Sequence, residues 1–334
     1  MTICGICAND RANRLHYPRE LMFGWGESFE YLECGHCGCL QITRIPEDLA
    51  RYYPQDYYAY HPPRVKRLPR LIQRLRALRT RHFLGESQLL GAFFALFSRR
   101  PEHFQWFERG RVTLETRILD VGCGTGRLLL KLEREGFRHV LGVDPYLQAE
   151  IRYDTGVTIL KRQLAELAGP FDFIMLHHSF EHMPEPGETL NQLHRLLAPG
   201  GTLLLRIPVA DCHAFRKYGV HWVAWDAPRH LYLHTVRSLH LLAQQCGFEM
   251  FDVSYDSTLS QFVTSELYLR GITCQDMPSR YAGGPKAAFT RQEWRHFARA
   301  AAELNRQRDG DTACFYLRAT GSTHNNHPPP DPDR

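Results

Sequence analysis

The chain has 334 residues, of which 43% are hydrophobic and 23% are charged, and these proportions are ordinary for a soluble globular protein. A formal net charge of +5 is weak evidence for a polyanionic partner. No apolar stretch approaches the roughly 20 residues of a membrane-spanning helix, and the N-terminus lacks the pattern of a secretory signal, so we expect a cytoplasmic protein.

The N-terminal segment is rich in cysteine. Five of the ten cysteines lie in residues 1–45, and four of them form two C-x-x-C pairs with glycines near the second pair (CGHCGC). This is the spacing of a tetrahedral zinc site, in which thiolates accept backbone hydrogen bonds. Residues 1–45 are therefore predicted to be a zinc-ribbon-like module. Its structural zinc ligands would be Cys4, Cys7, Cys34 and Cys37, with Cys39 as a replacement for Cys37 and unpaired or redox thiols as the alternative.

Residues 46–110 are predicted to be a connector and a basic helical region. The connector begins with the Tyr/Pro-rich stretch YYPQDYYAYHPP, which is not typical of a helix or strand. Residues 64–82 then contain eight Lys or Arg and no acidic residue, and apolar spacing predicts a helix over 70–81. LLGAFFALF (89–97) continues the helical region, and we expect it to pack against the main core. The basic stretch would suit RNA phosphates, an anionic membrane surface or packing on the core, and a simple solvated helix fits equally well.

From about residue 117, strand-like and helix-like segments alternate. The alternation predicts an α/β domain over residues 111–320, with a doubly wound, mostly parallel sheet. One helix, GETLNQLHRLLAPGG, is expected to end at its Pro-Gly-Gly, and residues 321–334 are predicted to be disordered. The predicted strands are RILDVG, HVLGVD, VTIL, FDFIMLHH, TLLLRIP, EMFDVSYD and ACFYLRA.

A glycine loop follows the first of these strands, in ILDVGCGTGR. Ligands of parallel sheets bind beyond the carboxyl ends of the strands, so a cofactor belongs at Gly122, Gly124 and Gly126. The loop lacks the Lys of a phosphate-binding P-loop and departs from the G-x-G-x-x-G of dinucleotide sites. Asp120 suits a cationic ligand, and Asp144, at the end of the next strand, can accept hydrogen bonds from ribose hydroxyls. These features predict S-adenosylmethionine, which has a ribose and a cationic aminoacyl group but no phosphate.

Four segments together resemble class I S-adenosylmethionine-dependent methyltransferases: ILDVGCGTGRLLL, GVDPY, FDFIMLHHSFEHMPEP and LHRLLAPGGTLLLRIP. The resemblance implies a seven-stranded Rossmann-like sheet, with Asp120 and the three glycines bordering the methionine half of the cofactor. It makes Cys123 a compact spacer rather than a nucleophile. The other cofactor contacts that it implies are Asp144 and Pro145 at the ribose, Gln163 and Leu164 at the adenine, and His177 with His178 near the sulfonium.

Histidines are the candidate bases, because methyl transfer from a sulfonium needs an aligned nucleophile and removal of a proton. The segment HWVAWDAPRHLYLHT resembles the W…D-x-P-R-H-L segment of small-molecule and sugar methyltransferases, which implies that His230 lies near the transferred methyl. His230 is the first predicted catalytic residue and His182 the second, with pocket lining as the alternative role. His177, His178, His221 and His234 are the remaining candidates. Trp222, Trp225 and Tyr232 fit either a water-excluding wall or a core.

The order of modules resembles two families. One is the bacterial sugar methyltransferases of deoxysugar and polysaccharide pathways; the other is a ribosomal RNA guanine methyltransferase family with an N-terminal zinc finger. C-methylating sugar enzymes carry a further C-terminal domain that this chain lacks, so we expect O- or N-methylation of a sugar, glycolipid or related small molecule. No [ND]-P-P-[YF] motif follows the fourth strand, which disfavours methylation of an exocyclic amine of a base or of a glutamine amide. No acidic cluster follows it either, which disfavours a magnesium-dependent, catechol-type mechanism. An RNA methyltransferase and a non-catalytic binding protein are the alternatives.

Overall fold

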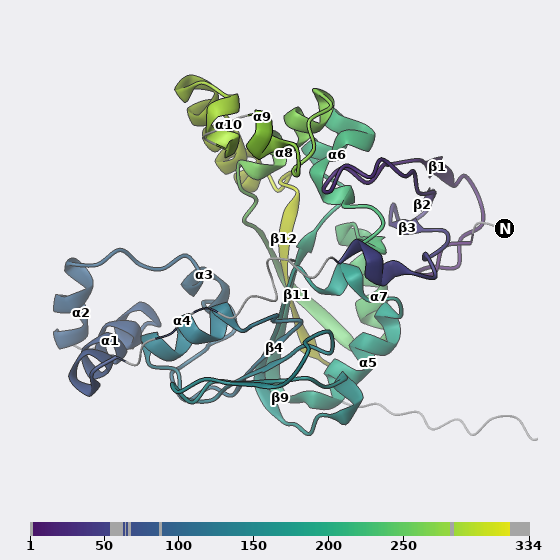
Figure 1. Ribbon diagram of the computed structural model, residues 1–334. Helices are drawn as coiled ribbons and strands as arrows, with labels where there is room; N and C mark the ends of the chain where they lie inside the picture. Colours follow the sequence, from purple (N-terminus) through teal and green to yellow (C-terminus); the bar gives the residue numbers. More distant parts are fainter. Residues whose placement is uncertain are drawn as a thin grey trace, which may run out of the picture.

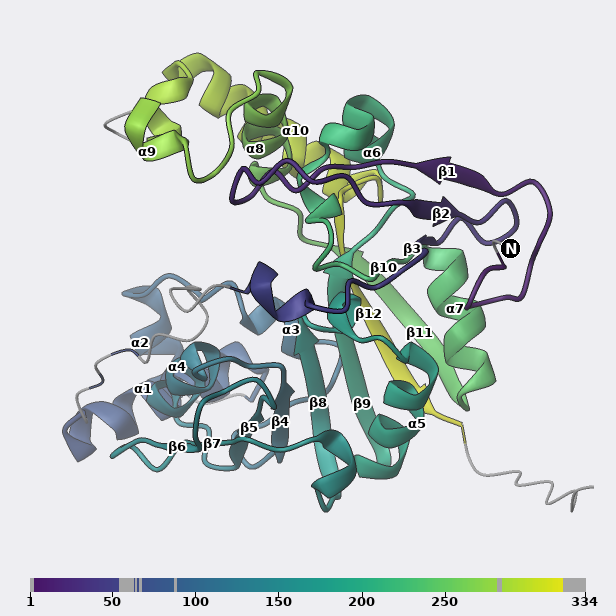
Figure 2. The same ribbon diagram turned by 45° about the vertical axis from the view of Figure 1, so that its right-hand side comes forward.

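The computed structural model describes residues 3–53, 68–86, 89–280 and 284–320, together with residues 63 and 65. Most of the Tyr/Pro-rich stretch and the whole predicted disordered tail lie outside the described residues. A large central sheet organises the molecule, with helices on both of its faces and a small second sheet beside it (Figures 1 and 2). No described helix combines the length and the apolar character needed to cross a membrane.

The central sheet confirms the predicted doubly wound α/β fold. Its strand order is β11-β12-β9-β8-β4-β5-β7-β6, and the strands from β9 to β7 run parallel. The order of the chain reverses between β4 and β8, which is the switch point at which such sheets bind ligands. The seven predicted strands are present, and the two-residue β6 adds an antiparallel eighth at the edge. The strands are β4 (Ile118–Val121), β5 (Val140–Val143), β6 (Ile151–Arg152), β7 (Thr158–Leu160), β8 (Phe171–His177), β9 (Leu197–Pro208), β11 (Phe248–Tyr255) and β12 (Thr312–Ala319).

Helices cover both faces of this sheet, because its central strands are apolar on both sides. In β4 all four side chains are buried, with Leu119 and Val121 in one hydrophobic cluster and Ile118 in the other. Helices α5 and α7 supply leucines to the first cluster, whereas α3 and α4 fill the second. The α-helices are α1 (Arg70–Phe83), α2 (Leu89–Leu96), α3 (Phe104–Phe107), α4 (Arg127–Glu135), α5 (Pro186–Leu196), α6 (His213–Tyr218), α7 (Val236–Gln245), α8 (Ser260–Leu269), α9 (Met277–Arg280) and α10 (Arg291–Arg306).

The N-terminal module forms a small antiparallel sheet of order β1-β2-β3-β10. Strands β1 (Arg14–His16), β2 (Tyr31–Glu33) and β3 (Leu40–Ile42) belong to the module, but β10 (Tyr232–Leu233) comes from the distant segment that contains His230. The Tyr31 hydroxyl also donates a hydrogen bond to the His230 carbonyl, 2.8 Å away. The module is therefore built into the main domain at the predicted acceptor side rather than attached by a linker.

Two local predictions differ from the structure. Helix α5 ends at Leu196, three residues before the Pro-Gly-Gly, which lies inside β9 instead, because Leu197 already pairs with Phe171 of β8. LLGAFFALF does form α2, but it packs on α1 rather than on the main core, and Leu89 is 93% exposed. Gly91 makes this close packing possible, because a Cβ there would lie 2.4 Å from the Leu78 carbonyl oxygen.

Candidate functional site

The glycine loop joins β4 to α4 at the carboxyl end of the sheet. Gly122, Gly124 and Gly126 all have positive φ, between 54° and 72°, a conformation that other residues rarely adopt. A Cβ at Gly122 would lie 2.4 Å from the Cβ of Ser179, and one at Gly126 would lie 2.3 Å from Cδ1 of Ile159. Gly122 and Gly126 therefore cannot be replaced without a clash, and the loop packs tightly against Ser179, just after β8, and against β7.

Asp144, immediately after β5, holds the loop in place. One carboxylate oxygen accepts a hydrogen bond from the Gly124 N–H at 2.9 Å, and the other accepts one from the Tyr146 N–H at 2.9 Å. The side chain is buried, and this burial raises its pKa even though both backbone hydrogen bonds lower it. Each oxygen retains a lone pair, so the carboxylate can also accept bonds from the hydroxyls of a ligand.

Asp120 is a second buried carboxyl group, at the end of β4. Its residue is only 4% exposed, and burial together with the charge of Asp144 raises its pKa to about 8. Among the described residues, no basic group contributes to the shift of its pKa, and none forms an ion pair with it. A buried acid without a basic partner is the arrangement that a cationic ligand group would stabilise.

Cys123 lies between these two acids and faces the sheet. Burial, with the charges of Asp120 and Asp144, raises the pKa of its thiol well above the ordinary value. Its sulfur packs over β5, where a Cβ added at Gly142 would lie 2.5 Å from it. A protonated, packed thiol is a poor nucleophile, which agrees with the predicted role of a compact spacer.

A second cluster brings together Glu181, His182 and His230. Glu181 and His182 lie on the 3-10 helix η4 (Phe180–His182) after β8, whereas His230 precedes β10. One potential ligand atom from each side chain lies within 4.8 Å of the other two. Glu181 is fully buried, with the His178 Nδ1 atom 3.4 Å and the His230 Nε2 atom 3.9 Å from its carboxylate. Neither of its oxygens receives a well-formed hydrogen bond from the described residues.

Backbone contacts fix the tautomers of the two histidines. The Nδ1 atom of His230 lies 2.7 Å from the Ala224 carbonyl oxygen, and that of His182 lies 2.9 Å from the Arg229 carbonyl oxygen. Because a carbonyl only accepts, each Nδ1 carries a proton, and the lone pair of a neutral ring then lies on Nε2. Burial, with His182 nearby, also lowers the pKa of His230 to about 4, so its ring is neutral near pH 7.

The charge of Glu181 completes the cluster. Burial by itself raises the pKa of this acid, but its contact with His178 and the neighbouring histidines lower that pKa to about 2. An ionised carboxylate beside two free imidazole nitrogens can receive a proton or bind a divalent cation. The sequence motif contained Glu181 and His182, but only the fold adds His230 from 48 residues further along the chain.

The Asp and Arg of the D-x-P-R-H segment are structural. Arg229 is completely buried, and its guanidinium donates hydrogen bonds to both carboxylate oxygens of Asp226, at 2.6 and 3.0 Å. It also pairs with Glu20 of the N-terminal module at 3.1 Å. Glu20 in turn accepts backbone N–H bonds from Met22, Phe23 and Trp25. Arg229, Asp226 and Glu20 form a clamp that the sequence did not predict. This clamp ties the module to the residue preceding His230.

The other predicted histidines are not among these three residues, although the Nδ1 atom of His178 lies 3.4 Å from the Glu181 carboxylate. His177 packs its ring on Trp106 at 4.3 Å, on the face of the sheet covered by α3, and His178 contacts Arg206. His234 is buried beside Phe180. Trp222 and Trp225 are each less than 3% exposed. Of the two predicted roles, a water-excluding wall or a core, these two side chains therefore have the second. Gln163 and Leu164 begin the 3-10 helix η3 (Leu164–Glu166) after β7, and His221 ends the short 3-10 helix η5 (Gly219–His221).

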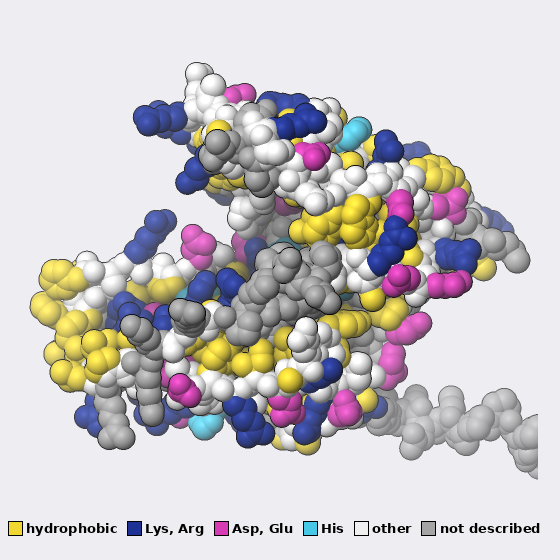
Figure 3. Space-filling view, in the orientation of Figure 1, with side chains coloured by type: hydrophobic (Ala, Val, Ile, Leu, Met, Phe, Trp, Pro, Cys, Tyr) yellow, Lys and Arg dark blue, Asp and Glu magenta, His cyan; other side chains and the backbone are white. Residues whose placement is uncertain are grey.

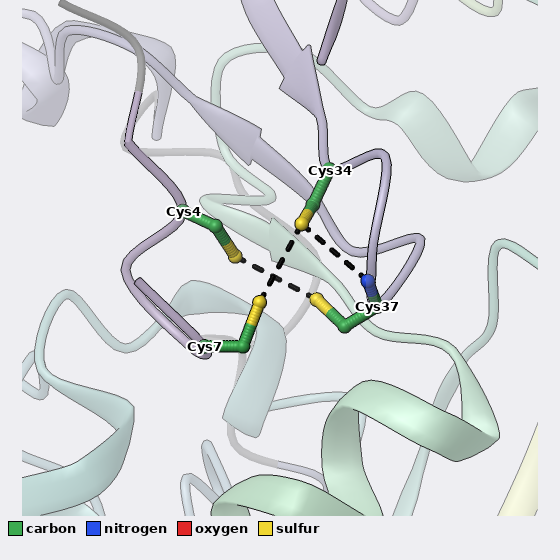
Figure 4. Close-up of side chains that lie close together, drawn as sticks. All are labelled: Cys4, Cys7, Cys34 and Cys37. Atoms are coloured by element: carbon green, nitrogen blue, oxygen red, sulfur yellow. Dashed lines mark hydrogen bonds between the residues drawn. The ribbon is translucent and has the colours of Figure 1, made fainter. Parts of the chain in front are cut away.

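Four cysteines of the N-terminal module converge on one point (Figure 4). The sulfurs of Cys4 and Cys37 lie 3.6 Å apart and those of Cys7 and Cys34 lie 3.5 Å apart. Tetrahedral zinc with Zn–S bonds of about 2.3 Å places its sulfurs about 3.8 Å from one another, so the donor set fits this ion. Backbone N–H groups of residues 36 and 37 also point at the Cys34 sulfur. Cys39 is buried outside the cluster, which leaves Cys37 as the fourth member.

Comparisons with known proteins identify the family of this chain. A family model described as a methyltransferase domain matches residues 64–253. The ubiquinone biosynthesis O-methyltransferase of Xylella fastidiosa (strain M23) is 32% identical over 162 residues, which cover 43% of this chain and 65% of that protein. The protein of the same description from Pseudomonas aeruginosa (strain UCBPP-PA14) is 28% identical over 201 residues, covering 54% of this chain and 84% of that one.

The Xylella match thus spans just under two thirds of that relative. Among solved structures, an S-adenosylmethionine-dependent methyltransferase from Thermotoga maritima, described as a possible histamine N-methyltransferase, overlaps with a TM-score of 0.40. It is 20% identical, and the overlap covers 74% of this chain and 91% of that chain. The family model, by contrast, spans more than half of the sequence and includes both carboxylates and the histidine cluster. The chain therefore belongs to the methyltransferase-domain family, the class I S-adenosylmethionine-dependent methyltransferases.

Proposed function

We propose that the protein transfers a methyl group from S-adenosylmethionine to a hydroxyl or amine of a sugar, glycolipid or related small molecule in the cytoplasm. One observation carries the cofactor part of the proposal. Two buried acids, Asp120 and Asp144, flank a glycine loop at the switch point of the sheet, and Asp120 has no cationic partner among the described residues. This pair suits a ligand that has both a positive charge and vicinal hydroxyls.

In this proposal the cofactor supplies an already activated methyl group, and the protein binds, orients and removes a proton. Asp120 and the glycine loop hold the cationic aminoacyl end, while Asp144 and Pro145 hold the ribose. Gln163 and Leu164, which follow β7, lie on the adenine side, and His177 is a further contact at the end of β8. The tight loop excludes water from the carboxylates, which strengthens their interaction with the charged ligand.

His230 is the proposed base, with His182 as the second candidate. The Nε2 atom of His230 is unprotonated, because its Nδ1–H is bound to the Ala224 carbonyl. It can accept the acceptor's proton while the nearby Glu181 carboxylate stabilises the resulting imidazolium. The names of the curated relatives, O-methyltransferases, favour a hydroxyl over an amine as the acceptor.

We further propose that Cys4, Cys7, Cys34 and Cys37 hold a structural zinc ion. Four thiolates form a closed coordination shell, so the ion has no open position for catalysis. Its effect on the site is mechanical: the module that it folds pairs β3 with β10 and supplies Glu20 to Arg229. Zinc would thereby fix the segment that positions His230.

Two measurements test the proposal. Calorimetry should detect S-adenosylmethionine binding to the wild-type protein and a loss of at least about 100-fold in affinity for Asp144→Ala, since two charge-assisted bonds disappear. The exposed Asp154→Ala is the matched control. Transfer of labelled methyl groups is then assayed with sugar and glycolipid acceptors and with RNA. Turnover that requires RNA and disappears with ribonuclease would favour the RNA methyltransferase, and binding without turnover of any acceptor would favour the non-catalytic alternative.

A further inference from the structure

Helices α1 and α2 form a hairpin that exposes an unusual number of large apolar side chains. Helix α2 has the sequence LLGAFFAL, without a single charged or polar residue, and it packs only one side on α1. Figure 3 shows these hydrophobic side chains gathered at the left end of the molecule. The exposed set comprises Leu71 (68%), Leu89 (93%), Leu90 (63%), Phe93 (54%), Leu96 (80%) and Phe97 (77%).

The same hairpin is strongly basic. Helix α1 contains five arginines and no acidic residue, and Arg99 and Arg100 come shortly after the end of α2. Several of these arginines are neutralised, since Arg79 pairs with Glu135 and Arg100 with Glu108. In the described part of the chain, Arg74 and Arg99 have no acidic partner, and both are exposed. Apolar and cationic groups thus lie on one projecting element.

This combination identifies the chemistry of the partner. RNA phosphates would explain the arginines but not an apolar helix facing the solvent. A second copy of the chain would explain the apolar helix, but it would bring the unpaired arginines of two hairpins together. An anionic lipid bilayer satisfies both features, because apolar side chains enter the acyl boundary while arginines contact the headgroups.

We propose that the α1–α2 hairpin docks the protein on anionic membranes, with α2 lying in the interface plane. Eight residues are far too few to span a bilayer, so the attachment is peripheral. The two kinds of group act together, as stable peripheral binding requires more than one signal. The inference goes beyond the proposed methyl transfer and does not depend on it, because none of these side chains belongs to the carboxylate pair or the histidine cluster.

Vesicle flotation with the full chain tests the proposal. We expect the protein to float with phosphatidylcholine vesicles that contain about 30% phosphatidylglycerol, and to bind pure phosphatidylcholine and high-salt samples far less. Leu89→Gln/Leu96→Gln should weaken binding at least about 20-fold, because two apolar side chains that would enter the bilayer are lost. Arg74→Gln/Arg99→Gln should weaken it about 25-fold at low salt, at about 5-fold per charge. Leu269→Gln, a half-exposed position on α8, is the control and should bind like the wild type.

Three results would overturn the inference. The first is equal flotation of the wild type and the Leu89→Gln/Leu96→Gln variant. The second is a dimer, measured by light scattering, that becomes a monomer in this variant while neither protein binds vesicles. The third is retention of the wild type by RNA alone, lost in the arginine variant, without vesicle binding. Calorimetric binding of S-adenosylmethionine should be the same in every variant, so failure of membrane docking is distinguishable from failure of the proposed function.

Discussion

Asp120→Asn keeps the shape of a buried side chain and removes its charge. Burial and the charge of Asp144 raise the pKa of Asp120 from 3.8 to about 8 in the folded protein. The folded chain therefore keeps a proton that the unfolded chain releases, so stability falls as the pH rises from about 4 to about 8. About 3 pH units of that interval lie below pH 7, and at about 1.4 kcal/mol each they give an upper bound of about 4 kcal/mol.

The asparagine variant should lack this pH-dependent cost. Without ligand we expect it to unfold at a higher temperature than the wild type at pH 7 to 8, with the difference shrinking toward pH 4. At about 2 °C per kcal/mol for a chain of this size, the gap should reach several degrees. Thermal unfolding followed by circular dichroism across this pH range measures it. The exposed Asp154→Asn is the matched control and should unfold like the wild type at every pH.

Cofactor binding provides a second measurement of the effect of Asp120→Asn. A cationic ligand beside Asp120 favours the ionised carboxylate, so wild-type binding at pH 7 should release close to one proton. Calorimetry in two buffers with different ionisation enthalpies measures this release, which should vanish in Asp120→Asn together with at least about ten-fold of the affinity. Unchanged affinity in the variant, or a wild type that releases no proton, would refute the assignment of Asp120 to the cationic end.

Three further predictions concern the histidine cluster, the clamp and the cysteine site. His230→Gln should lower kcat about 100-fold or more while leaving cofactor affinity within a few-fold, and the control His221→Gln should leave kcat unchanged. Burial lowers the pKa of His230 to about 4, so the acidic limb of the wild-type kcat/KM profile should lie near pH 4 rather than near pH 6.5. Arg229→Met should reduce the free energy of unfolding in urea by about 3–5 kcal/mol, since it leaves Asp226 and Glu20 buried without their partner. The control Arg216→Gln breaks an exposed pair with Asp309 and should reduce this free energy by less than about 1 kcal/mol. Cys34→Ser should abolish the zinc content measured by atomic absorption and lower kcat with it, whereas Cys39→Ser should retain the metal, and equal zinc in both variants would contradict the ligand assignment.

Local patterns were enough to predict the central fold and the cofactor side of the candidate site. The glycine loop, Asp120 and Asp144 lie within about thirty residues of one another, on consecutive strands whose alternation is visible in the sequence. Hydrophobic strands and amphipathic helices are short-range features, so their positions could be predicted to within a few residues. The exception at Pro199-Gly200-Gly201 has a tertiary cause, because pairing with β8 extends β9 backward through the expected turn.

Contacts between distant segments were decided only by the tertiary structure. Glu181 and His230 meet because β8 ends beside the segment preceding β10, and nothing in the spacing of the two residues signals that contact. The pairing of β10 with β3 involves two residues on each strand and joins positions almost two hundred residues apart. Arg229 and Glu20 are equally remote, and neither charge pattern nor periodicity predicts a buried ion pair between them.

The sequence by itself predicted the glycine loop and its two acids, because the geometry of a strand, a glycine turn and the acids beside it is encoded locally. It also identified the four cysteines by their spacing. Only the tertiary structure decided which histidine joins Glu181, how the cysteine module supports that histidine, and that α2 faces solvent rather than the core. Those features depend on which surfaces of the folded chain bury one another, and burial is a property of the whole packing rather than of any short segment.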